Sequence, residues 1–278
     1  MKLWFLLSFL LVTFFGNTQQ AEEVQKADSL YNAQKFFEAS VWYLHLLYAN
    51  TSASMNQQAI EGKLKCLKKD NHFIEAIDFI QNSKEENITD SFKAHLEYEE
   101  LLCNYLAGNF KETIQLSSNL HNNMYDTIGG LITVLSYNEL YKWKEADSMV
   151  QLLLLKVSSN DSVISHIFTN TPKLKNIKKG KLLANIFPGA GQLYAGKFWE
   201  GLANSALQFG SLWFTILSWQ REYYFTAGLI GFNGFDSFRK GGKTRTEILV
   251  EQYNKKENIA FKQKNKDVLI KWYQKLIK

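Results

Sequence analysis

A near match to a phosphate-binding loop occurs at Gly191-Gln-Leu-Tyr-Ala-Gly196-Lys197, which has the spacing Gly-x-x-x-x-Gly-Lys. In such a loop the lysine and the backbone N–H groups hold phosphates, and a following Ser or Thr holds magnesium. Here Phe198 occupies the hydroxyl position, and Pro188 interrupts the segment where a buried strand would have to precede the loop. These departures argue against nucleotide binding, so no nucleotide and no cofactor are expected.

The other residue types that support catalysis or metal binding show no recognisable spacing. The five histidines lie at positions 45, 72, 95, 121 and 166, without a His-x-x-x-His or Cys-x-x-Cys pair. The acidic group Glu97-Tyr-Glu-Glu100 is expected to be a solvated helix face. We therefore predict neither a metal site nor a catalytic centre. An enzyme remains a third hypothesis, because a site assembled from distant residues leaves no local pattern.

Four segments in the first half of the chain resemble one another: Gln34-Lys-Phe-Phe-Glu-Ala39, Asn71-His-Phe-Ile-Glu-Ala76, Gly108-Asn-Phe-Lys-Glu-Thr113 and Tyr141-Lys-Trp-Lys-Glu-Ala146. Each has an aromatic anchor and, three residues later, a small residue; the pairs are Phe36 and Ala39, Phe73 and Ala76, Phe110 and Thr113, Trp143 and Ala146. Each segment lies between two helix-patterned stretches. The pattern resembles the tetratricopeptide repeat, in which such a turn joins two antiparallel helices. The resemblance covers residues 22–156 and implies a helical-repeat solenoid.

The two cysteines fall at equivalent places in this frame. Cys66 and Cys103 each lie ten residues before the small residue of their repeat. A disulfide is one interpretation in an exported protein. Equivalent positions of adjacent repeats are usually too far apart for such a bond, however, so small buried thiols are the favoured interpretation.

Composition and charge point to helices and to a membrane. The chain has 278 residues, of which 46% are hydrophobic and only two are proline. The net charge of +5 gathers in lysines and arginines beside the apolar runs, as membrane flanks do, and no base-reading motif accompanies it. No nucleic-acid partner is expected. Residues 1–20, with one lysine and then a short apolar run, form a signal-peptide pattern. An uncleaved N-terminal anchor is the alternative.

The second half of the chain predicts an apolar helical hairpin. Residues 198–219 and 223–238 are apolar and are separated only by the tight turn Gln220-Arg-Glu222. Small residues at intervals of three and four are expected to let the two helices pack closely in lipid: Gly201, Ser205, Ala206, Gly210, Gly228, Gly231 and Gly234. Glu200, Asn204 and Gln208 keep open the alternative of a buried hairpin in a soluble domain.

A Gly-rich motif opens this hairpin. It consists of Pro188, Gly189, Gly191, Gln192, Tyr194, Gly196, Lys197 and Trp199. The motif resembles that of a bacterial membrane-domain family of unknown function, Pro-Gly-x-Gly-Gln-x-Tyr-x-Gly, and is similar to the start of two-transmembrane-helix domains. The resemblance covers residues 180–245 and implies membrane attachment. Related proteins are often exported ones with tetratricopeptide repeats, and the resemblance implies no known chemistry.

The expected fold is therefore all-α. It comprises a signal peptide (1–20), tetratricopeptide-like repeats (22–156), a basic linker (157–181), a transmembrane helical hairpin (182–240) and a basic amphipathic C-terminal helix (241–278). The expected function is non-catalytic: an exported adaptor in the bacterial inner membrane, with the repeats on the periplasmic side and a protein or peptide on their surface. The alternative is a subunit of a membrane protein insertion or envelope biogenesis assembly, whose hairpin contacts membrane partners. The side of the C-terminal tail and the crossing of residues 182–196 are left open.

Overall fold

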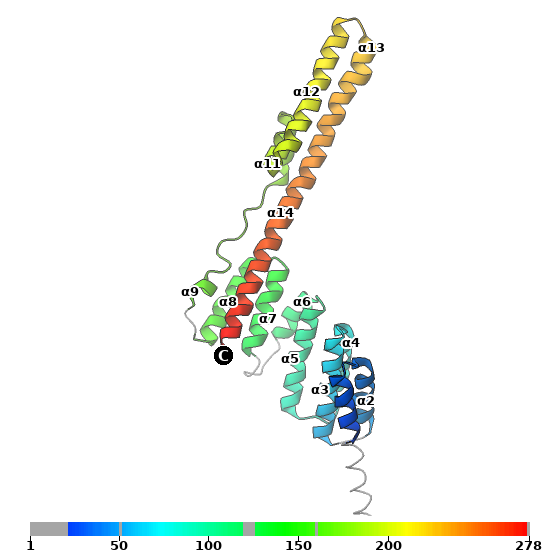
Figure 1. Ribbon diagram of the computed structural model, residues 1–278. Coiled ribbons are helices and arrows are strands. Elements are labelled where there is room, and N and C mark those ends of the chain that lie inside the picture. Colours follow the sequence, from blue (N-terminus) through cyan, green and yellow to red (C-terminus); the bar gives the residue numbers. More distant parts are fainter. Residues whose placement is uncertain (1–21, 50–51, 119–125, 159–160, 277–278) are drawn as a thin grey trace, which may run out of the picture. The chain divides into compact units, whose positions relative to one another are not determined.

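The computed structural model describes residues 22–49, 52–118, 126–158 and 161–276, and all regular elements in these ranges are helices (Figure 1). The all-α fold class is thereby confirmed. The predicted signal peptide lies outside the described residues. The chain divides into two compact units, Met1–Phe168 and Thr169–Lys278, and each unit is described by itself below.

The first unit is a succession of helices, each packed against the next along the chain. A helix over residues 22–32 comes first. The helices that follow are α2 (Phe36–Tyr48), α3 (Ala53–Lys69), α4 (Phe73–Ser83), α5 (Asp90–Leu106), α6 (Phe110–Ser117), α7 (Asp126–Glu139), α8 (Trp143–Lys156) and α9 (Ser162–Ser165).

One turn geometry joins the helices of each predicted repeat. Its central residue has a left-handed backbone at Gln34 (φ 60°), Asn71 (φ 60°), Gly108 (φ 83°) and Tyr141 (φ 58°). In the first turn the Gln34 N–H donates to the Tyr31 carbonyl and the Lys35 N–H donates to the Leu30 carbonyl, and the other three turns repeat this pair of bonds. Such bonds satisfy the last carbonyls of a helix and reverse the chain.

The predicted packing residues occupy equivalent positions after these turns. The aromatic anchors Phe36, Phe73, Phe110 and Trp143 are the first residues of α2, α4, α6 and α8. The small residues Ala39, Ala76, Thr113 and Ala146 are each 0% exposed. Because these side chains are small and fully buried, they allow neighbouring helices to approach closely.

Both cysteines are free and buried, so the disulfide interpretation is wrong. Burial raises the pKa of the Cys66 thiol to about 11 and that of the Cys103 thiol to about 12. At neutral pH both groups are therefore protonated, and protonated thiols are poor nucleophiles.

The second unit begins with an extended segment, followed by α10 (Ile177–Ile186), α11 (Ala190–Ala195) and α12 (Phe198–Gln220). A turn leads to α13 (Tyr224–Thr226), the π-helix η1 (Ala227–Phe232) and α14 (Asn233–Leu276). The chain runs up α12 and returns along α13, η1 and α14, as Figure 1 shows. The first arm of this hairpin is α12, and the second arm is α13, η1 and the first part of α14.

Three expectations about this region need correction. Residues 157–181 are not a plain linker, since they contain α9 and the start of α10. No helix boundary falls at residue 240, because α14 continues for 44 residues with no proline to end it. Finally, no helix in the described part of the chain is both long enough and apolar enough to cross a membrane, which differs from the expected transmembrane hairpin. In α12 the residues Glu200, Asn204 and Gln208 lower the mean hydropathy.

The left-handed turns predict opposite effects of two matched substitutions. Gly108→Ala should destabilise a chain of residues 22–168 by about 1 kcal/mol, because a β-carbon is strained at φ 83°. The space around Gly108 is open, so no steric clash adds to this cost. Asn71→Gly should stabilise the same chain by up to about 1 kcal/mol, since glycine adopts φ 60° freely. Urea unfolding followed by circular dichroism measures both, and equal midpoints would contradict the assignment.

Candidate functional site

The Gly-rich motif folds as a turn, a short helix and a second turn. α10 gives way to extended backbone at Phe187, and Gly189 then adopts φ 79° directly before α11. α11 ends at Gly196, which adopts φ 88°. Side chains are disfavoured in both conformations, so glycine is favoured at each turn. The residues between the two turns are helical and do not form an open phosphate-binding loop.

The first turn lies directly against the start of α12. A β-carbon on Gly189 would overlap the carbonyl oxygen of Gly201 and the hydroxyl of Ser205. A β-carbon on Gly201 would in turn lie 2.9 Å from the carbonyl oxygen of Gly189. The Ser205 hydroxyl donates to the carbonyl oxygen of Pro188 at 2.8 Å. Glycines on both sides therefore allow a backbone-to-backbone contact that a side-chain hydrogen bond then fixes.

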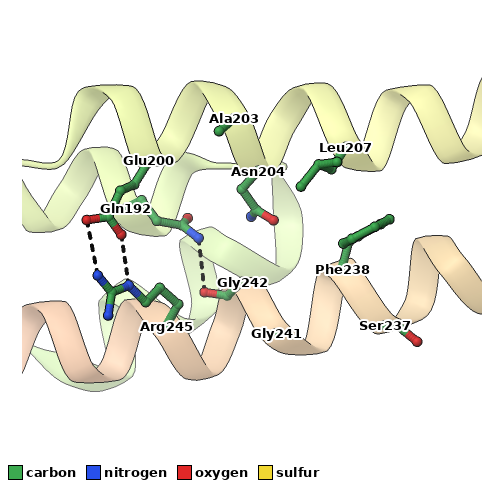
Figure 2. A pocket seen from close by; sticks show the side chains of 10 residues that line it. All are labelled: Gln192, Glu200, Ala203, Asn204, Leu207, Ser237, Phe238, Gly241, Gly242 and Arg245. Atoms are coloured by element: carbon green, nitrogen blue, oxygen red, sulfur yellow. Dashed lines mark hydrogen bonds and ion pairs between the residues drawn. The ribbon is translucent and has the colours of Figure 1, made fainter.

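α11 is held against α14 by two residues of the motif. Gly191 packs on Thr246, where a β-carbon would overlap the threonine hydroxyl. The Gln192 side chain is 1% exposed, and its Nε2 donates to the carbonyl oxygen of Gly242 at 3.2 Å (Figure 2). The motif thus determines how closely α11 and α14 approach.

Tyr194 fixes the chain that precedes α10. Its hydroxyl accepts from the backbone N–H of Asn176 at 2.9 Å. The ammonium groups of Lys175 and Lys179 each lie 5.9 Å from the centre of its ring, within range of a cation–π attraction. Lys175 also lies 3.7 Å from the centre of the Tyr253 ring on α14. Tyr194 therefore has a structural role in this unit.

Two motif residues, Lys197 and Trp199, are exposed to solvent, unlike those that pack inside the unit. Lys197 is exposed and directly precedes α12. Trp199 is 77% exposed and touches the ring of Phe198 edge-on, with 5.2 Å between ring centres. The remaining predicted residues pack inside the unit or form its turns, so Trp199 is the aromatic of the motif that is available to a partner or to lipid.

The turn of the repeats recurs twice in this second unit. At Gly196 and at Glu222 (φ 66°) the same pair of backbone hydrogen bonds closes the turn, and a helix begins two residues later. A small buried residue follows three positions into the next helix in each case, Gly201 and Ala227. A signal for the first of these turns is present in the sequence, since Ala195-Gly-Lys-Phe-Trp-Glu200 parallels Ala107-Gly-Asn-Phe-Lys-Glu112. This turn was not among the four predicted from the sequence.

The interface between the two arms of the hairpin is polar. A polar series on α12 is buried or lies against the second arm and recurs at intervals of four and three: Asn204, Gln208, Ser211, Thr215 and Ser218. Two leucines of α12, Leu212 and Leu217, are half-buried next to this series. On the second arm, glycines face the polar series. A β-carbon on Gly231 would overlap Thr215, and one on Gly242 would overlap the Asn204 amide. This spacing is that of a coiled-coil seam, but small and polar side chains stand where a water-soluble seam carries leucine or isoleucine.

Of the small residues expected at this interface, Gly231 lies close to α12. Gly234 lies farther from it, since an added β-carbon would be 3.7 Å from the Ser211 hydroxyl. Gly201 and Ser205 instead contact the motif turn. Gly210 and Gly228 have open space around them, so they do not serve helix packing. Periodicity alone did not distinguish these cases, because it does not determine which face of a helix meets its neighbour.

The outer surface of the hairpin is apolar. Large hydrophobic side chains that are 38–78% exposed cover both arms and the turn: Phe198, Trp199, Leu202, Leu207, Phe209, Trp213, Phe214, Ile216, Trp219, Tyr223, Tyr224, Phe225, Leu229, Ile230, Phe232 and Phe238. We call these residues the apolar outer surface. Contiguous exposed apolar surface of this kind marks a contact with protein or lipid.

Charged pairs lie at the base of the hairpin, beside the motif. Arg245 of α14 donates two hydrogen bonds to the Glu200 carboxylate, at 2.8 and 3.2 Å. The hydrogen bond from Arg245 is the largest cause that holds the pKa of Glu200 below its ordinary value. Lys181 of α10 pairs with Glu247 of α14 at 2.6 Å. These two ion pairs thus lie at the end of the hairpin where the apolar outer surface stops.

Comparison of the chain with protein-family models, with curated proteins and with solved structures finds no match. The resemblances to tetratricopeptide repeats and to the bacterial membrane domain therefore stay predictions.

The contact between Gly189 and Gly201 predicts a selective loss of stability. Gly189→Ala should destabilise the second unit by about 2 kcal/mol or more, because the β-carbon meets both a strained φ and the Gly201 carbonyl. Gly210→Ala, on the open side of α12, should leave stability unchanged or slightly raised. Thermal unfolding of the full chain, with limited proteolysis after α10 as a second readout, measures the difference. Similar behaviour of the two variants would contradict the proposed contact.

Proposed function

We propose that this protein is a membrane-anchored helical-repeat adaptor of the bacterial envelope, and that it has no catalytic role. The observation that carries the proposal is the inverted polarity of the hairpin, with polar and small residues between the arms and apolar residues outside. In water, such a hairpin would hide little apolar surface and expose much of it. In lipid the same arrangement is favourable, because small and polar interfaces join helices there.

The charge distribution supports the same proposal. Lysines and arginines cluster at the base of the hairpin, before α12 and after η1: Lys173, Lys175, Lys178, Lys179, Lys181, Arg239, Lys240, Lys243 and Arg245. Basic residues beside an apolar segment interact with anionic headgroups at roughly 1 kcal/mol each near the surface. Three carboxylates neutralise only part of this charge: Asp236 pairs with Arg239 and Lys240, Glu247 with Lys181, and Glu200 with Arg245.

The first unit supplies a surface suited to a peptide or protein partner. A cavity of about 310 Å³ lies among α2, α3 and α4. Its lining includes the exposed apolar residues Phe37 and Val41 together with the charged residues Lys63 and Asp70. An apolar groove with a few charges at its rim fits an amphipathic peptide segment. With an N-terminal signal peptide, this surface would face the periplasm, and the hairpin would hold it at the inner membrane.

Membrane anchoring can be tested on the apolar outer surface. In a chain that starts at Ala21, the triple variant Trp213→Ser, Ile216→Ser and Leu229→Ser should move from the carbonate-washed membrane pellet to the soluble fraction. The matched control is Leu152→Ser, Leu155→Ser and Val163→Ser, three exposed apolar residues of the first unit. The control should stay in the pellet with the unchanged chain. Retention of the hairpin variant in the pellet would contradict the anchor.

The second candidate function is a subunit of a membrane protein insertion or envelope biogenesis assembly, and the exposure of Trp199 beside the motif favours it. A photo-crosslinking amino acid at position 199 should label lipid alone if the hairpin is only an anchor. Reproducible labelling of one membrane protein would support the assembly function instead. Position 194 is the matched control, because Tyr194 packs inside the unit and should give no crosslink to another protein.

A further inference from the structure

A cavity of about 300 Å³ opens between α11, α12 and α14, beside the Gly-rich motif (Figure 2). The lining residues change in character from one end of the cavity to the other. The ion pair of Glu200 with Arg245 lies at one end, the amides of Gln192 and Asn204 lie in the middle, and Leu207 and Phe238 lie at the other end. Charged, polar and apolar groups in this sequence match the headgroup, linkage and chain of an amphiphile.

The two amides in the middle have unused hydrogen-bonding atoms. Gln192 is 1% exposed, and its Nε2 is engaged with the Gly242 carbonyl, so its Oε1 is left as an acceptor. Within the described residues this Oε1 has no hydrogen-bond partner, and neither has the buried Nδ2 of Asn204. Buried polar groups are normally paired, so the cavity calls for a ligand with one N–H or O–H donor and one acceptor.

The ends of the cavity specify the ligand further. Glu200 and Arg245 offer one negative and one positive charge, both partly exposed, and this pair complements a zwitterion. Arginine binds phosphate well, and a carboxylate binds ammonium. A primary ammonium has N–H groups for both Glu200 and Gln192 Oε1, whereas a quaternary ammonium has none. Leu207 and Phe238, which belong to the apolar outer surface, continue the cavity toward the lipid contact proposed above.

We propose that this cavity binds one phospholipid with a primary-amine zwitterionic headgroup. The phosphate contacts Arg245, the ammonium donates to Glu200 and to Gln192 Oε1, and an ester carbonyl accepts from Asn204 Nδ2. The acyl chains leave over Leu207 and Phe238. The inference rests on the proposed membrane anchoring, since the lipid reaches the cavity from the bilayer.

The test uses the full chain reconstituted into vesicles with equal parts of phosphatidylethanolamine, phosphatidylcholine and phosphatidylglycerol. After extraction into a mild detergent, native mass spectrometry should show one retained phosphatidylethanolamine, at least tenfold enriched over phosphatidylcholine. Gly241→Leu should lower this occupancy at least tenfold, because Gly241 lines the cavity and its side-chain direction is open. Gly210→Leu is the matched control: it is an equally open helical glycine outside the cavity, and it should retain the lipid.

A second variant tests the headgroup contact. Gln192→Leu removes the acceptor and should reduce the preference for phosphatidylethanolamine over phosphatidylcholine to about onefold. Soluble glycerophosphoethanolamine, added as a competitor, should not displace the lipid, since it lacks the chains that contact Leu207 and Phe238; displacement would assign the cavity to a free headgroup and overturn the proposal.

Other outcomes also overturn the inference. One is equal retention of phosphatidylethanolamine by the Gly241→Leu and Gly210→Leu variants. Another is the absence of any headgroup preference. A third is a protein that binds vesicles but retains no lipid after extraction. A protein that fails to associate with the vesicles would instead overturn the membrane anchoring itself, so the two failures are distinguishable.

Discussion

The second unit depends on the close approach of two backbone segments, the turn at Gly189 and the first turn of α12 at Gly201. A β-carbon on either residue would meet the backbone of the other segment. Because this contact brings α11 beside α12, Gln192 can reach the Gly242 carbonyl and Gly191 can pack on Thr246. The same three helices, α11, α12 and α14, line the cavity, and the Glu200–Arg245 pair joins α12 to α14.

The hairpin reverses the usual arrangement of polarity in a helical pair. Amides, hydroxyls and glycines lie between the arms, and aromatic and aliphatic side chains lie outside. Buried amides such as Gln192 and Asn204 cost free energy when unpaired, at about 1–3 kcal/mol each. A polar interface is therefore an expensive way to join two helices in water. It is suited to an environment in which the outer apolar surface is covered.

A single turn geometry recurs in both units, although their surroundings differ. It reverses the chain at Gln34, Asn71, Gly108 and Tyr141, and again at Gly196 and Glu222. The left-handed residue ends one helix, an aromatic begins the next, and a small buried residue lets the helices pack. In the first unit Ala39 and Ala76 belong to a buried hydrophobic core, whereas in the second unit Gly201 packs on the motif turn.

The helical class, the four turns of the first unit and the two arms of the hairpin follow from the sequence, because periodic apolar residues and local turn chemistry act over a few positions. The tertiary structure decided what depends on distant residues. It set which glycines are packing sites (Gly189, Gly201 and Gly231) and which are not (Gly210 and Gly228). It joined the last part of the second arm and the tail into one helix, α14, and paired Glu200 with Arg245. Such contacts join residues 12 to 45 positions apart, and no local pattern records which faces will meet.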